Sequence, residues 1–455
     1  MSIEKWLQPE GCPAQRPSTG DMNAATKSLH DAIDDHIRQE GIAYLHPSDK
    51  TVQLDLLGTA PMVEWQEGKV ELLLGGEACW SELPQVYARY GTEAGSALLA
   101  KFRALEGASA ALVCESGMQA SALVFDVLIE PGSHAVMFRQ VYNKTEKYLG
   151  WLAERTGSEV TIVDDGDLEG LAAAIRPNTR MVFAETYSNP LMRALDLTRV
   201  PAIVAEARAI APRVKLVVDS TLATPWGLAK PLLASGVDVV IASATKALGG
   251  QDRDLGGMIA TNNIDLANSA MDLLAMRGGI LDWRRAEVFL EGLEAAQAAH
   301  ATRCKGASAV AAFLDAHPLV NEVFHPSLPS HLDAEAIADG YTRHGSLLSF
   351  RLNASGEDAA RKFCDALATC KVVRYALSFD GVCTKVNHHK SVSEYFTPDE
   401  ALRRSGLNEL IRLAVGVEDA DDICAALNWA LHKGMHLSDE ELTQWRLDRT
   451  TELGL

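Results

Sequence analysis

The sequence predicts an α/β protein with a mostly parallel central sheet and a smaller C-terminal α+β domain. From about residue 95, short β-branched runs alternate with helical segments, as in a parallel sheet between two helical layers. After residue 295 the pattern changes to a long alanine-rich helix followed by short strands. At 455 residues the chain is also too long for one ordinary core, so we expect at least two domains.

The predicted elements follow from turn signals and apolar periodicity. A helix should end at Gly107, a second should begin at Ser116, and a turn and strand should follow at 131–138. Further strands are expected at 159–165, 180–186, 215–220, 238–244 and 256–261, with helices at 167–176 and 200–210. The C-terminal part should hold helices at 295–317, 419–434 and 438–452, with strands at 346–352 and 371–379.

Composition excludes several classes of function. The chain has 42 basic and 61 acidic residues, a formal charge of −19, and no basic run, so it lacks the positive footprint of a nucleic-acid binder. We find no secretory signal and no apolar run long enough to span a membrane. The eight cysteines are scattered without a CxxC pair, which favours reduced thiols in a cytoplasmic protein over structural zinc.

Two predicted strands, one after the other in the chain, end in polar residues. Asp219 ends "KLVVD", and Lys246 follows "DVVIASA". Because ligands of open α/β sheets bind outside the carboxyl ends of the strands, one crevice could hold both side chains. An amine, a carboxylate and the hydroxyls of Ser243 and Thr245 are what pyridoxal 5′-phosphate (PLP) requires. The alternative is a surface lysine and an aspartate that forms a turn or cap.

Three other places have both a functional and a structural interpretation. Gly117 and Met118 begin a predicted helix, where backbone N–H groups bind phosphate or small residues allow helix–sheet packing. Tyr142 follows a strand and either stacks on a cofactor or packs in the core. Arg412 lies in an apolar strand, where its fork binds a substrate carboxylate or an internal acidic residue.

Six motifs occur in an order that resembles one enzyme family. They are "YARYG", "SGMQA", "ETYSNPLM", "VVDSTLATP", "SATKALGG" and "LIRLAVGVED". Between about residues 85 and 432 the chain is similar to the Cys/Met-metabolism family of PLP enzymes. This family includes cystathionine γ-synthase, cystathionine γ-lyase, methionine γ-lyase and O-acylhomoserine sulfhydrylases. The resemblance implies the fold type I of PLP-dependent transferases, which is aspartate-aminotransferase-like.

The resemblance also implies a role for each matching residue. Lys246 forms the Schiff base with the cofactor, Asp219 pairs with the pyridine nitrogen, and Tyr142 stacks on the ring and assists proton transfer. The implied phosphate site consists of Gly117, Met118, Ser243 and Thr245. The implied substrate-binding residues are Asn189, Ser378 and Arg412.

The family pattern further implies an oligomer with shared active sites. Tyr87 and Arg89 match a pair that reaches the phosphate of a neighbouring subunit, so we expect a homodimer or homotetramer. The expected division is an N-terminal segment (1–85) that contributes to the neighbouring subunit, a large PLP-binding domain (86–295) and a small domain (296–455).

Departures from the family pattern lie on the substrate side. Asn143 and Lys144 replace the glycines that usually follow the stacking tyrosine. The segment "SFDGVC" stands where many members read "SLGGVE", which puts Cys383 at a position tied to substrate choice. We therefore expect Cys383 to contact the substrate, and we expect the substrate, a small amino acid, to be unusual.

The expected activity is γ-replacement through a vinylglycine-type intermediate, with a homoserine ester, thioether or sulfonium as donor. A γ- or β-lyase acting on methionine, cystathionine or cysteine, with release of a 2-oxo acid and ammonia, remains an alternative. A nicotinamide-dependent oxidoreductase is a distant one, because the chain lacks GxGxxG. We expect no metal site: His388 and His389 are adjacent, no second ligand cluster accompanies them, and a solvated loop is the favoured interpretation.

Overall fold

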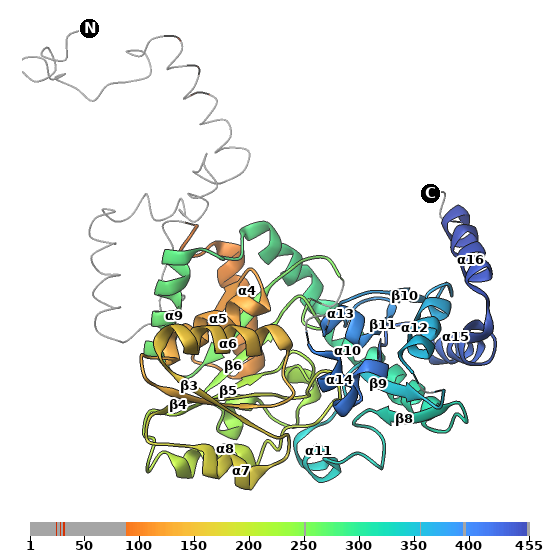
Figure 1. Cartoon of the computed structure of the whole chain (residues 1–455). Coiled ribbons are helices and arrows are strands. Elements are labelled where there is room, and N and C mark those ends of the chain that lie inside the picture. The colour runs from red at the N-terminus through yellow and green to blue at the C-terminus, as the bar shows by residue number, and fades with distance from the viewer. Residues whose placement is uncertain are drawn as a thin grey trace, which may run out of the picture.

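Two sheets organise the part of the protein that the structure describes (Figure 1). The structure is a computed structural model, and it describes residues 88–249, 252–354, 356–394 and 397–452, with residues 24, 28 and 31. The predicted N-terminal segment (1–85) lies outside the described residues apart from these last three positions. Tyr87 also lies outside them.

The larger sheet has seven strands in the order β1-β7-β6-β5-β4-β2-β3. Their bounds are β1 (Ala110–Cys114), β2 (His134–Phe138), β3 (Glu159–Val163), β4 (Thr179–Glu185), β5 (Lys215–Asp219), β6 (Val239–Ser243) and β7 (Gly257–Thr261). Strands β2 to β6 pair in parallel, whereas β7 runs antiparallel to both β6 and β1. The predicted mostly parallel α/β sheet is therefore confirmed.

Helices cover both faces of this sheet, which explains why its strands are continuous apolar runs rather than alternating ones. One core contains side chains of α5 (Gly117–Leu128), α6 (Asn143–Thr156) and α9 (Ile264–Arg277). The core on the opposite face contains side chains of α4 (Glu93–Glu106), α7 (Leu168–Ala174) and α8 (Arg199–Ala207). Figure 1 shows α7 and α8 below the sheet and α5 and α6 above it.

Local capping sets the ends of the first two helices as the sequence predicts. Gly107 closes α4 at a φ of 62°, a left-handed conformation that suits glycine. The Ser116 hydroxyl accepts a hydrogen bond from the Gln119 N–H and so begins α5. This cap fixes the N-terminus of α5 beside the end of β6, where the functional side chains gather.

The smaller sheet has the order β10-β11-β12-β9-β8. Its strands are β8 (Val320–Phe324), β9 (Leu347–Leu352), β10 (Val373–Tyr375), β11 (Thr384–His388) and β12 (Ile411–Ala414). The other helices are α10 (Trp283–Asp315), α11 (Ala334–Gly340), α12 (Glu357–Leu367), α13 (His389–Ser393), α14 (Asp399–Ser405), α15 (Ala420–His432) and α16 (Asp439–Glu452). Helix α10 has 33 residues and begins well before the predicted 295, so the boundary expected at 295/296 falls inside it.

The expectation of a solvated loop around His388 and His389 is wrong. All five residues of β11 are buried, and the two histidines are only 1% and 2% exposed. His388 hydrogen-bonds the Ser391 hydroxyl at 2.7 Å and the Asn408 carbonyl at 2.8 Å, so its polar atoms are satisfied inside the domain. Within the described residues, no group of three or more His, Cys, Asp or Glu side chains could hold a metal ion. No helix in the same ranges is long and apolar enough to cross a bilayer.

Candidate active site

A pocket of about 430 Å³ lies at the carboxyl ends of β4, β5 and β6, and it is lined by residues of both sheets and their loops. This is where open α/β sheets bind ligands. The predicted site residues that line it are Gly117, Met118, Tyr142, Asn189, Asp219, Ser243, Thr245, Lys246, Ser378 and Arg412. The structure thus brings together side chains that are up to 295 positions apart in the sequence, from residue 117 to residue 412.

Lys246 follows β6 and reaches the segment that connects β10 to β11. Its Nζ donates a hydrogen bond to the Ser378 Oγ at 3.0 Å and lies 5.2 Å from the centre of the Phe379 ring. Burial lowers the pKa of the Lys246 ammonium below its ordinary value. A larger fraction of this side chain is therefore the free amine, the form that attacks an aldehyde.

Asp219 ends β5 and is paired in register with Glu185, which ends β4. The Oδ1 of Asp219 accepts the Thr221 N–H at 2.8 Å, and burial raises the pKa of its carboxyl group. Glu185 also lines the pocket, and the sequence analysis did not single it out. Its register with Asp219 is the signal that the sequence alone does not show.

The N-terminus of α5 packs directly against the end of β6. A Cβ atom on Gly117 would lie 2.7 Å from the Ser243 Cβ and 2.9 Å from its Cα, closer than real atoms approach. Only glycine therefore lets the first N–H groups of α5 come beside the Ser243 hydroxyl, and helix N-termini attract phosphate. The Thr245 hydroxyl has backbone partners, since it donates to the Gly256 carbonyl at 3.3 Å and accepts its N–H at 3.0 Å.

Tyr142 and Arg412 occupy the open and the buried side of the pocket. The Tyr142 side chain is 43% exposed, so it does not pack in the core. Arg412 is only 3% exposed, and burial lowers the pKa of its guanidinium to about 10. It donates to the Leu377 carbonyl at 2.5 Å and to the Asn189 Oδ1 at 3.3 Å. Across the described ranges Arg412 has no carboxylate within ion-pair distance, so the internal salt bridge considered from sequence does not form there.

Two predicted site residues lie outside this pocket. Cys383 does not line it, because the Glu418 carboxylate accepts the N–H and hydroxyl of the next residue, Thr384, and so holds this segment against the loop after β12. The predicted contact between Cys383 and the substrate is therefore not part of this pocket, and it stays a prediction. The Arg89 guanidinium donates to the Ala275 carbonyl at 3.1 Å, also away from the pocket of its own chain.

Residues 79–432 match the family described as Cys/Met metabolism PLP-dependent enzyme. The chain belongs to this family. As a Cys/Met metabolism enzyme it is PLP-dependent, so the distant nicotinamide alternative is set aside.

Known members of the Cys/Met metabolism family are similar along most of the chain. The L-methionine gamma-lyase of Fusobacterium nucleatum is 31% identical over 355 residues, which cover 77% of this chain and 87% of that protein. The cystathionine gamma-synthase of Mycobacterium tuberculosis is 32% identical over 345 residues, 76% of this chain and 86% of that protein. The crystal structure of metB from Corynebacterium glutamicum has a TM-score of 0.70 at 30% identity, covering 76% of this chain and 87% of that one.

The donor set of the pocket fits PLP. It offers an amine (Lys246) and a carboxylate (Asp219) at the ends of neighbouring strands, as well as a helix N-terminus whose first residue must be glycine. Lys246 would hold the aldehyde carbon, Asp219 the ring nitrogen, and the start of α5 with Ser243 the phosphate. Phe379, Thr221, Asn143 and Lys144 also line the pocket and were not predicted as contacts.

Proposed function

We propose that this enzyme replaces a substituent on the γ-carbon of an amino acid, with a homoserine ester, thioether or sulfonium as donor. The position of Lys246 carries the proposal. Its amine lies at the boundary between the cofactor side and the substrate side of the pocket, within 3.0 Å of Ser378. One base placed there can remove protons from two adjacent carbons, Cα and Cβ, as a reaction at Cγ requires. The γ-synthase and γ-lyase relatives support the same reaction class.

Bound PLP supplies an electron sink for negative charge on the substrate carbons. The chain's own residues do the rest. Lys246 removes the proton at Cα and then one at Cβ, which allows the γ-substituent to leave. The Ser378 hydroxyl orients the amine between these steps, and the Tyr142 hydroxyl assists the proton transfers. Arg412 and Asn189, already hydrogen-bonded to each other, hold the substrate carboxylate.

A lyase reaction is the second candidate, and the similarity to a methionine γ-lyase favours it. Replacement and elimination share their early steps and differ in what reaches Cγ afterwards. In the lyase reaction Cγ gains a proton, and water then hydrolyses the carbon–nitrogen bond at Cα, which releases a 2-oxo acid and ammonia. In replacement a nucleophile adds at Cγ and the amino acid survives.

A panel of γ-substituted amino acids in deuterium oxide tests the proposal. We expect deuterium at both Cα and Cβ of recovered material and, with a thiol present, a new γ-thioether amino acid. Release of 2-oxo acid and ammonia at the same rate with and without thiol would favour the lyase. Label confined to Cα would contradict γ-chemistry of either kind.

Arg412→Lys tests the carboxylate site. A lysine cannot reproduce the two-point contact of the guanidinium, and a charge-assisted hydrogen bond is worth about 1.5–3 kcal/mol, so KM should rise by roughly 10- to 100-fold. Arg361→Lys, which alters an exposed arginine paired with Glu357, is the control and should leave KM unchanged. A normal KM in R412K would place the carboxylate elsewhere.

We further propose that Tyr87 and Arg89 complete the pocket of a neighbouring copy in a homodimer or homotetramer. Arg89 lies away from its own pocket, and Leu255 and Leu377, which line the pocket, are 57% and 67% exposed in the single chain. A second copy would cover these apolar side chains.

A further inference from the structure

Glu185 has no role in the mechanism proposed above, although it lies beside the residues that carry it out. It ends β4 beside Asp219 and lines the cofactor pocket. Its Oε1 accepts the Tyr142 N–H at 2.6 Å, and its carboxyl group also accepts the Asn189 N–H. One side chain therefore holds the backbone of the residue that would stack on the cofactor ring and of the residue that would bind the substrate carboxylate.

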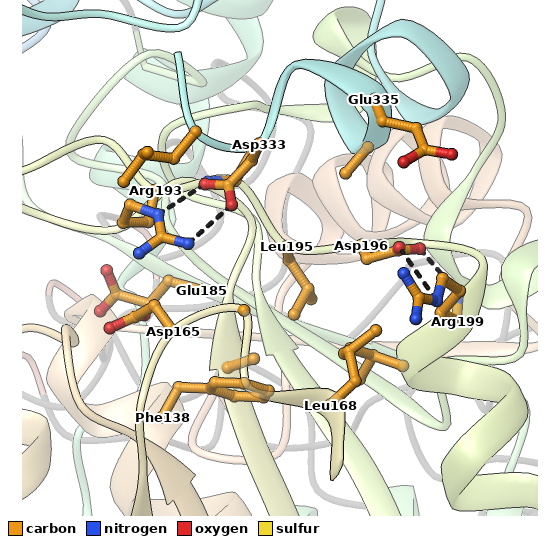
Figure 2. Close-up of a pocket in the computed structure, with 16 residues that line it drawn as sticks. Phe138, Asp165, Leu168, Glu185, Arg193, Leu195, Asp196, Arg199, Asp333 and Glu335 are labelled. Atoms are coloured by element: carbon orange, nitrogen blue, oxygen red, sulfur yellow. Dashed lines mark hydrogen bonds and ion pairs between the residues drawn. The ribbon is translucent and has the colours of Figure 1, made fainter. Parts of the chain in front are cut away.

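A second cavity, of about 190 Å³, lies on the other side of Glu185. Figure 2 shows Glu185 next to Asp165 in this cavity, near the Arg193–Asp333 pair. Among the described residues, Glu185 is the only one that lines both this cavity and the cofactor pocket. The second cavity has room for several water molecules, so the Glu185 carboxyl can exchange a proton without opening the cofactor pocket.

The charges around Glu185 are mainly negative. Asp219 faces it from β5 and Asp165 from the loop after β3. Arg193, from the loop after β4, is a positively charged residue near Glu185. Its Nε and Nη2 both donate to the Asp333 carboxylate at 2.7 Å, so its charge is already paired. Registered residues on neighbouring strands are separated by about 4.8 Å, and two carboxylates at that spacing in a half-buried site do not both ionise readily.

We propose that Glu185 is a positioning residue that acts as a neutral carboxylic acid, holding Tyr142 and Asn189 by their N–H groups while Asp219 alone carries the negative charge. The single proton stays on Glu185 because Asp219 accepts the Thr221 N–H and would pair with the ring nitrogen of bound PLP. Burial, followed by the nearby Asp219 charge, raises the pKa of Glu185 well above its ordinary value, in agreement with this assignment.

The first test measures stability against pH in the cofactor-free full-length chain. A carboxyl with a raised pKa keeps its proton in the folded state after the unfolded chain has lost it. The stability that it contributes is therefore present at low pH and lost as pH rises above the unfolded value of 4.5. Glu185→Gln cannot lose a proton, so its unfolding midpoint should rise relative to wild type between pH 5 and pH 8. Each unit of pKa shift corresponds to about a tenfold change in the folding equilibrium constant.

Glu335→Gln is the matched control, because Glu335 is an exposed glutamate of the second cavity and does not line the cofactor pocket. Its unfolding midpoint should run parallel to that of wild type across the same pH range. If E185Q also runs parallel to wild type, Glu185 ionises normally and the proposal is overturned.

The second test reads the visible circular dichroism of bound PLP, which reports the orientation of the ring. Glu185→Leu removes the acceptor and should lose most of this signal, whereas Glu185→Gln keeps an acceptor and should keep its sign. Equal loss in both variants would mean that a charged carboxylate is required, and no change in E185L would mean that it positions nothing. The inference rests on the cofactor and not on the proposed reaction at Cγ, and neither test uses turnover.

Discussion

Lys246→Ala is expected to lower kcat by at least about 10⁴-fold, because in the proposed mechanism this one side chain supplies both the covalent link to PLP and the base for two proton transfers. Its free amine, favoured by burial, and its hydrogen bond to Ser378 are lost together. Turnover of the best γ-substituted amino acid measures the effect. Borohydride should fix the cofactor to Lys246 in the wild-type chain, as mass spectrometry of the modified peptide would show.

Lys230→Ala is the control for this variant, since Lys230 is an exposed lysine of the large domain outside the pocket. It should retain wild-type kcat and the same borohydride-labelled peptide. A K246A protein with kcat within tenfold of wild type, or a label on another lysine, would remove the basis of the proposed function.

Arg303→Met is expected to lower the free energy of unfolding by about 3–5 kcal/mol, the usual cost of leaving a buried charge uncompensated. Arg303 is fully buried on α10, and its Nε lies 3.9 Å from the carboxylate of Asp380, which is 1% exposed. Asp380 also accepts a hydrogen bond from the Ser346 hydroxyl. Denaturant unfolding of the purified chain measures the loss.

Asp380→Gly in the R303M background should recover part of this loss. It removes the stranded carboxylate, and Asp380 has a φ of 52°, a left-handed conformation in which glycine is unstrained. The recovery would show that Asp380 and Arg303 depend on each other. If the double variant is no more stable than R303M, the ion pair does not account for the destabilisation.

The sequence predicts the large sheet and the convergence of Asp219 and Lys246 on one pocket, for a physical reason. Strands buried on both faces are recognisable as short β-branched runs, and a polar residue at the end of such a run stands out. Asp219 and Lys246 were found in this way, and they line one pocket. The helix end at Gly107 and the start of α5 could also be predicted from the sequence, because helix caps depend on local chemistry alone.

The smaller domain was harder to predict, because its polar residues are satisfied by partners far away in the chain. Strand β11 ends in His388, a buried histidine whose ring hydrogen-bonds a carbonyl 20 positions away in the chain, so the sequence of this segment resembles that of a solvated loop. Helix α10 begins in a stretch rich in charge and was expected to start twelve residues later, at 295 rather than 283. The neighbour of Glu185 on the next strand appears only once the sheet register is known.

The Lys246 amine and the Ser378 hydroxyl, which are 3.0 Å apart, belong to different sheets: Lys246 follows β6 and Ser378 follows β10. The pocket is thus lined by residues of both sheets, so its geometry depends on how the two sheets pack against each other. Substitution of Ser378 should therefore change the hydrogen bonding of the Lys246 amine while the strand that carries Asp219 stays intact.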